Sequence, residues 1–297
     1  MKSTQENVPK GSFDPNQVAA TNTAHNDVDG RQSARWANEV EFFDRLADRI
    51  ERGLRPFSSK ELNRYTRHPR RIYDKEFRFR MLGDLTGLRV LDLGCGEGSN
   101  SVFLALNGAQ VVGLDISPRL IELAKKRAGL NGVESKTQFR CIPIERAELP
   151  ESSFDVIWGD GILHHLIDVL EPTLQQLVRC AKPGARIVFS EPVAQNLLLR
   201  SLRGHVPIHT DATPDERPLE TRELELINKY LPGLRAQHFH GLGRLTQFVV
   251  PVHAYEEAPW HRRLLADALH TADFAMLSVP GLRSLGGMRV MWGEVRK

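Results

Sequence analysis

The sequence contains little cysteine. Three residues in 297, Cys95, Cys141 and Cys180, stand far apart along the chain. So few thiols argue against a disulfide framework and fit a reducing compartment, so we expect a cytoplasmic protein. No two cysteines have the C-x-x-C spacing of a zinc site, and the histidines show no tight ligand spacing, so we expect no metal.

Long apolar runs are also missing. No stretch approaches the roughly 20 apolar residues that a spanning helix needs, so we expect no membrane span. The N-terminus, Met-Lys-Ser-Thr-Gln-Glu-Asn, has no apolar core, and we expect no secretory signal. The net charge of +3 is too small to indicate a nucleic-acid partner by itself.

The first 84 residues divide into a tail and a helical extension. Residues 1–30 are polar, and we expect a disordered tail. Apolar residues recur at helical spacing from Trp36 to Ile50, and a second helix is predicted from Asp74 to Leu82. Residues 31–84 thus form a predicted extension or lid. Seven cations between Arg64 and Arg80 favour either a solvated helix face or an anion-binding lid that meets an acidic substrate or a cofactor carboxylate.

The rest of the chain, residues 85–297, predicts one α/β domain. Strands and helices alternate, which is typical of βαβ units and a mostly parallel sheet with helices on both faces. Lys182-Pro183-Gly184 predicts a turn, and about 45 residues of helical character precede the last strand. We expect a core at 85–195 and substrate cap elements within 192–285. The predicted strands are 88–93, 110–114, 138–142, 154–158, 186–190, 234–240 and 289–295; the helices are 100–106, 118–128, 169–180 and 221–230.

A glycine-rich turn follows the first predicted strand. Gly94, Gly96 and Gly98 permit positive φ and let a ligand approach bare backbone, and the next helix offers unpaired N–H groups. Asp115, at the end of the second strand, can accept hydrogen bonds from a ribose diol. The pattern predicts a nucleoside site at the carboxyl edge of the sheet.

The spacing indicates which nucleoside. A dinucleotide fingerprint starting at Gly94 would place a glycine at position 99, which is Ser99. Asp92 would repel a pyrophosphate and suits an ammonium or sulfonium. A nicotinamide oxidoreductase is therefore disfavoured.

Val90 to Gly98 resembles motif I of the class I S-adenosylmethionine (SAM)-dependent methyltransferases. The resemblance continues through Asp115, the strand 154–158, Leu163-His164-His165 and Lys182-Pro183-Gly184, and is closest to the small-molecule branch that includes quinone and natural-product enzymes. It implies a Rossmann-like fold, SAM as cofactor and a small-molecule acceptor. It also implies cofactor contacts from Asp92, Gly94, Cys95, Gly96, Asp115, Ile116, Gly159 and, in the lid, Tyr65. Glu145 and Arg146 replace the family's adenine-contacting aspartate, which puts that contact in doubt.

Polar residues follow the fourth and fifth strands. His164 or His165 could be a general base near neutral pH, or could cap or pack in the next helix. Asp160 could be a base or bind a cationic acceptor. Glu191 could line the acceptor pocket or cap the next segment, and Tyr65 could instead be a packing residue.

Several alternatives stay open. Nucleic-acid methyltransferases carry Asn/Asp-Pro-Pro-aromatic or Pro-Cys motifs, and Gly159-Asp160-Gly161-Ile162 has neither. A SAM-binding regulator without activity also fits the loop. Apolar residues in the late insertion indicate an aromatic or apolar acceptor, or only pack the cap onto the sheet. The residues are Phe248, Val249, Val250, Trp260, Leu264, Leu265, Phe274, Met276 and Leu277.

Overall fold

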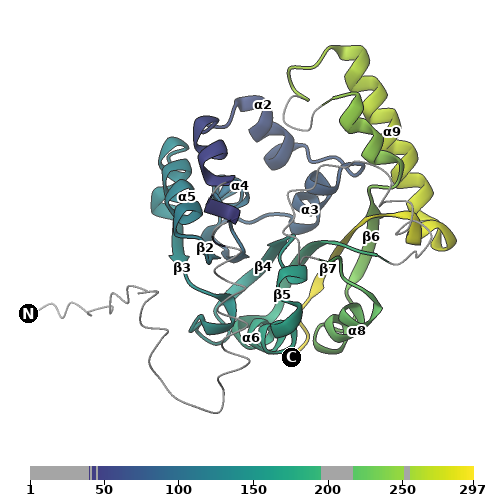
Figure 1. The fold of residues 1–297 in the computed structure, drawn as a ribbon. Helices are drawn as coiled ribbons and strands as arrows, with labels where there is room; N and C mark the ends of the chain where they lie inside the picture. The colour runs from purple at the N-terminus through teal and green to yellow at the C-terminus, as the bar shows by residue number, and fades with distance from the viewer. Residues whose placement is uncertain (1–39, 41, 45, 195–216, 251–254) are drawn as a thin grey trace, which may run out of the picture.

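The computed structural model describes residues 40, 42–44, 46–194, 217–250 and 255–297 (Figure 1). The predicted tail at 1–30 and residues 195–216, which follow the fifth strand, lie outside these residues. The centre is a seven-stranded sheet of order β3-β2-β1-β4-β5-β7-β6. Strands β1 to β5 are parallel, and β7 pairs antiparallel with both β5 and β6. The predicted fold class is confirmed.

The element bounds agree with the predicted pattern. Strands are β1 (Arg89–Leu93), β2 (Gln110–Asp115), β3 (Thr137–Cys141), β4 (Phe154–Asp160), β5 (Ala181–Pro192), β6 (Arg235–Phe239) and β7 (Met288–Glu294). The helices flanking them are α4 (Ser99–Leu106), α5 (Pro118–Leu130), α6 (Leu170–Cys180) and α8 (Thr221–Tyr230). Short 3-10 turns are η3 (Glu134–Lys136), η4 (Ile144–Arg146), η5 (Leu163–His165) and η6 (Ile167–Val169).

The expected turn at 182–184 is wrong. These residues belong to β5, which already begins at Ala181. Gly184 has a φ of +75°, and the β4–β5 register shifts between Phe154 and Val156. The strand is irregular here but is not interrupted by a separate turn, because β5 pairs with β4 both before Gly184, at Ala181, and after it, at Arg186.

Two apolar layers enclose the sheet, because successive strand residues point to opposite faces. Val90, Val156 and Trp158 pack in the layer with α4, α5 and α3 (Asp74–Leu82). Leu91 and Ile157 pack in the layer with α6 and α8. Parallel strands buried on both faces need such continuous apolar runs. The sheet thereby fixes the carboxyl ends of β1, β2 and β4 at one edge.

Two further groups of helices flank that edge. The extension comprises helical residues within 40–52, α2 (Ser59–Leu62), the π-helical turn η2 (Asn63–Arg67) and α3. The insertion between β6 and β7 comprises η7 (Leu242–Phe248), α9 (Trp260–Ser278) and η9 (Pro280–Leu285). Figure 1 shows α2 and α9 rising on either side above the sheet. None of the described helices is long and apolar enough to cross a membrane.

Candidate active site

The loop between β1 and α4 lies at the carboxyl edge of the sheet. Gly94, Gly96 and Gly98 all have positive φ, of 60°, 53° and 81°. A Cβ on Gly94 would lie 2.5 Å from Ile162 Cδ1, and one on Gly98 2.8 Å from Ala124 Cβ, so both positions require glycine. A Cβ on Gly96 would meet nothing within 4 Å. The backbone is thus open to an approaching ligand at Gly96.

Asp115 ties this loop to the end of β2. Its Oδ2 accepts from the Gly96 N–H at 2.9 Å, and its Oδ1 accepts from the Ser117 N–H at 2.9 Å. Burial raises the pKa of this carboxyl, and the backbone N–H bonds oppose the rise. A carboxylate oxygen has more than one lone pair, so each still has acceptor capacity for a hydroxyl. Ile116, the next residue, accepts a hydrogen bond from the Cys141 thiol on β3.

Asp92 is buried beneath the loop. Ser101 Oγ donates to Asp92 Oδ2 at 2.5 Å. Burial raises the pKa of this carboxyl to about 7, with further contributions from the negative charges of Asp160, Glu97 and Asp115. Four carboxyls from β1, β2, β4 and the loop thus influence one another at this edge. Their mutual repulsion would be relieved by a cationic ligand.

Asp160, at the end of β4, faces the N-terminal extension. Its Oδ1 lies 2.5 Å from Arg78 Nη1, and its Oδ2 accepts from the Asn100 side-chain amide at 3.0 Å. The Arg78 guanidinium is 4% exposed, also pairs with Asp74 and lies over the Trp158 ring. Asp160 therefore enters the site as half of an ion pair, which the sequence pattern did not reveal. Arg78 and Asn100 were missed as site residues.

Glu191 lies within β5, near its carboxyl end, and does not line an open wall. It is fully buried, and its Oε1 accepts from the backbone N–H groups of Ile162 and Leu163 at 3.0 and 2.9 Å. Its Oε2 lies 2.9 Å from His164 Nδ1. The expected role of Glu191 as a pocket-lining substrate contact stays a prediction. Its carboxylate holds the turn after β4 and the His164 ring.

The remaining predicted residues divide between edge and interior. Cys95 is buried, and its N–H bonds to the Leu114 carbonyl. A Cβ on Gly159 would lie 2.7 Å from Phe189 Cδ1, so packing alone requires glycine there. The His165 ring lies 4.2 Å from the His164 ring and 6.0 Å from that of Phe43. Glu145 and Arg146 form η4, after β3.

Tyr65 belongs to an aromatic group beneath the extension. It is 9% exposed, and its ring lies 4.8 Å from Phe103 and 5.7 Å from Phe79. The Lys75 ammonium stands 5.1 Å from the Tyr65 ring and 5.3 Å from the Phe103 ring. Tyr65 packs against the helix that follows the glycine loop, and a cofactor contact from it stays a prediction.

Lys75 is partly buried and lies within ion-pair distance of no carboxylate among the described residues. Burial lowers the pKa of its ammonium, and the nearby Asp160 and Glu97 raise it. Lys75 and Arg78 stand three residues apart on α3, so they share a helix face. That spacing was the signal in the sequence that could have singled them out from the basic segment.

The other arginines of this segment divide between the two interpretations: Arg67, Arg71 and Arg80 are exposed, whereas Arg64 and Arg70 are paired. Arg64 Nε lies 2.6 Å from Glu76 Oε1, and Arg70 Nη2 lies 2.7 Å from the same oxygen. Arg64 also pairs with Glu256, and Arg70 with Asp267 on α9. We call Arg64, Arg70, Glu76, Glu256 and Asp267 the clamp. The clamp joins the extension to the insertion between β6 and β7.

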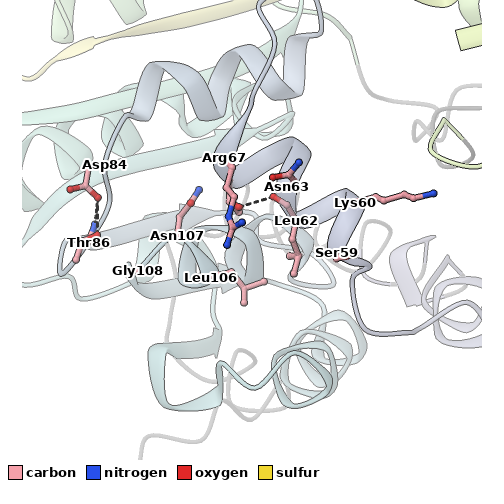
Figure 2. Close-up of a pocket in the computed structure, with 11 residues that line it drawn as sticks. Ser59, Lys60, Leu62, Asn63, Arg67, Asp84, Thr86, Leu106, Asn107 and Gly108 are labelled. Atoms are coloured by element: carbon pink, nitrogen blue, oxygen red, sulfur yellow. Dashed lines mark hydrogen bonds between the residues drawn. The ribbon is translucent and has the colours of Figure 1, made fainter.

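A groove of about 880 Å³ lies at the other end of the sheet. Figure 2 shows that Asp84, Thr86 and Gly108, near the amino ends of β1 and β2, line it together with Lys60 and Arg67 of the extension. It contains none of the predicted site residues. Within the described part of the chain, no cluster of three or more His, Cys, Asp or Glu residues could hold a metal ion.

Comparison with known proteins shows what the chain is similar to. Residues 84–218 match the model of a methyltransferase domain family. This stretch of the chain is therefore similar to a methyltransferase domain. Ubiquinone biosynthesis O-methyltransferase of Bordetella pertussis is 38% identical over 112 residues, which are 36% of this chain and 44% of that protein. Ajmaline N-methyltransferase of Rauvolfia serpentina is 28% identical over 178 residues, 59% of this chain and 55% of that protein.

Solved structures agree on the fold. Phosphoethanolamine N-methyltransferase 2 of Haemonchus contortus superimposes with a TM-score of 0.51 at 18% identity, covering 73% of this chain and 51% of that one. A putative sarcosine dimethylglycine methyltransferase of Galdieria sulphuraria gives 0.51 at 16% identity, covering 74% and 83%. The chain spans about 44% of the length of the first curated relatives it matches. The methyltransferase resemblance predicted from the motifs is confirmed.

Proposed function

We propose that the protein transfers a methyl group from SAM to a small organic acceptor. The observation that carries this proposal is the set of carboxyls at the carboxyl edge beside an open glycine backbone. Burial and mutual repulsion hold the pKa of Asp92 near 7, so the site favours a cationic ligand. SAM carries a sulfonium and an ammonium on a nucleoside, and relatives in the family are named as methyltransferases.

Different residues at this edge would contact different parts of the cofactor. Asp115 would accept from the ribose hydroxyls, Ile116 would lie against the adenine, and Asp92 would stabilise the cationic part. The Gly96 backbone leaves room for the methionine portion. Lys75 is suited to the methionine carboxylate, because its ammonium faces the loop helix without an ion-pair partner among the described residues. Bound there, SAM supplies an activated methyl group.

His164 would accept the acceptor's proton. The acceptor's lone pair forms the new bond to the methyl carbon while the C–S bond breaks, and the proton passes to the His164 imidazole. Glu191 would act through His164 as a positioning residue, because its Oε2 fixes Nδ1 at 2.9 Å. An acceptor that arrives as a neutral amine would depend less on this pair.

The class of acceptor is narrowed by where the insertion's side chains lie. Phe248 is 75% exposed and Trp260 is 70% exposed, so neither lines an interior pocket. These two residues therefore give no support to the expected aromatic or apolar acceptor, which stays a prediction. The groups near the end of β4 are Asp160, Arg78 and His164. We propose an acceptor that offers these groups a hydroxyl or an amine. We also propose that the protein works in a reducing cytoplasm and has no nucleic-acid partner.

The experiment is a paired measurement on the purified chain. Isothermal titration with SAM tests binding, and mass spectrometry of reactions with phenolic, quinol and amine acceptors tests transfer. Binding together with a methylated product supports the proposal. Binding without any product across the panel would favour a SAM-binding regulator. Failure to bind SAM or S-adenosylhomocysteine at millimolar concentration would contradict the proposal.

A further inference from the structure

Apolar side chains exposed to solvent are concentrated in one part of the molecule. Nine large hydrophobic residues are exposed among those described, and eight of them lie between positions 242 and 282. Solitary exposed apolar residues need no explanation, but a concentration of them marks an interaction surface. We call these eight residues the apolar surface: Leu242, Leu245, Phe248, Trp260, Leu264, Leu265, Val279 and Leu282.

Within each element, the exposed apolar side chains share a side. Residues three apart on a 3-10 helix share a face, so Leu242, Leu245 and Phe248 line one side of η7. On α9, Trp260 and Leu264 stand one helical turn apart, with Leu265 beside Leu264. Figure 1 shows the N-terminal end of α9 at the top of the molecule, farthest from the sheet.

The opposite face of α9 holds the helix in this orientation. Ala266, His270, Asp273 and Leu277 are its buried residues, at spacings of four, three and four. Asp273 Oδ2 accepts from the His240 N–H at 3.0 Å. Because this inner face is fixed to β6 and η7, the leucines cannot turn inward without breaking it. Their exposure is thus built into the fold.

In the insertion, most acidic side chains bond toward the interior, whereas two arginines are exposed. Glu256, Asp267 and Asp273 bond inward, to Arg64, to Arg70 and to the His240 backbone. Arg262 and Arg283 are exposed, and neither makes an ion pair with the residues that the structure describes. Glu257 is an exposed carboxylate in the preceding loop. The outward side therefore combines bulky apolar groups with arginines.

We propose that the apolar surface binds peripherally to a lipid bilayer that contains anionic headgroups. On α9, Trp260 and Leu264 share one side, and the exposed Arg262 stands three residues from the exposed Leu265. Such a helix suits the interface, where apolar groups enter the headgroup boundary and cations meet phosphates. A second copy of the chain is a poorer occupant. A two-fold contact would bring the same exposed arginines of both copies to one interface, where they repel.

The test is co-sedimentation of the full chain with vesicles. One set is phosphatidylcholine alone, and the other is phosphatidylcholine with about a third phosphatidylglycerol. We expect binding to the anionic vesicles to exceed binding to neutral ones by about tenfold and to weaken with salt. The double variant Leu264→Glu, Leu265→Glu should reduce anionic-vesicle binding about tenfold or more. Leu130→Glu, at an exposed leucine on α5, is the matched control and should bind as wild type.

Two further measurements keep the proposal falsifiable. Arg262→Glu leaves the leucines intact and should lower the preference for anionic vesicles if the double variant fails to fold. Light scattering without lipid tests the competing occupant. A dimer that the leucine double variant abolishes would overturn the membrane proposal in favour of self-association. Absence of vesicle binding, or equal loss in Leu130→Glu, would also overturn it. None of these results bears on SAM binding at the loop between β1 and α4.

Discussion

The glycine-loop site and the clamp place carboxylates in opposite circumstances. At the loop, Asp92 and Asp115 accept hydrogen bonds from a serine hydroxyl and backbone N–H groups, with no cation within ion-pair distance among the described residues. In the clamp, Glu76 is fully buried between two guanidiniums. A neutralised carboxylate stabilises a structure, whereas carboxylates without cations can receive a cationic ligand. The carboxylates of the glycine loop are therefore suited to bind a ligand, whereas Glu76 holds the extension and the insertion together.

The largest expected effect comes from removing the clamp's shared carboxylate. Glu76→Ala leaves Arg64 and Arg70 facing each other, mostly buried, without their common partner. We expect unfolding to become easier by about 3–5 kcal/mol, measured by urea denaturation. Glu122→Ala, which removes an exposed pair with Arg119, is the control and should cost less than about 1 kcal/mol. Equal losses in the two variants would remove the contrast between clamp and surface.

A change of Glu191 tests the proposed positioning of His164. Glu191→Gln keeps the side chain's shape but removes the carboxylate that faces Nδ1. With a hydroxyl acceptor we expect kcat to fall about 100-fold, because a general base contributes roughly that much or more, and the SAM affinity to stay within about threefold. Steady-state kinetics over pH 6 to 9 measure it. An unchanged kcat and pH profile would assign Glu191 to structure alone.

The pH dependence of SAM binding tests whether the Asp92 carboxyl beside the glycine loop responds to a cationic ligand. The pKa of Asp92 is about 7 without ligand, and a nearby cation lowers it. Binding therefore releases a proton below that pH, so affinity should rise from pH 6 to pH 8, by about threefold to tenfold. Titration calorimetry in two buffers measures it. Asp92→Asn should flatten the dependence, and the same slope in that variant would place the titrating group elsewhere.

The same pKa predicts an opposite trend in stability. The unfolded carboxyl titrates near 4, so the protonated form is favoured by folding between about pH 4 and 7. The contribution of Asp92 is most favourable below pH 4 and is lost as the pH rises through 7. Asp92→Asn should therefore raise the melting temperature of the ligand-free protein at pH 8 more than at pH 5. A larger gain at pH 5 would contradict the assigned environment.

The sequence predicted those parts of the fold and of the site that are set by residues close together in the sequence. The alternation of strands and helices sets the sheet, and the loop from Asp92 to Gly98 brings its ligand groups together within one turn. Asp115 was found because parallel strands end at one edge. The helix predicted at about Asp74 to Leu82 is confirmed. These features follow from period, turn chemistry and strand direction.

Other parts could not be predicted because distant segments make them. Arg64 meets Glu256 and Arg70 meets Asp267 nearly 200 positions away, and no local pattern indicates such pairs. Glu191 lies near the end of β5, at the expected edge, but its burial depends on how the turn after β4 folds back over it. The outward direction of Trp260 and Leu264 likewise follows from the inner face of α9, which a list of apolar residues does not reveal.

The central claim is that the carboxyl edge of β1 and β2 binds SAM through Asp115. The most direct measurement is the SAM affinity of Asp115→Ala beside Asp155→Ala, a carboxylate at the amino end of β4 that bonds Lys182 and the Arg89 N–H. We expect Asp115→Ala to weaken binding by about 1–3 kcal/mol, through the loss of hydrogen bonds to a charged group. Asp155→Ala should leave the affinity unchanged. Equal affinities in both variants and the wild type would contradict the account.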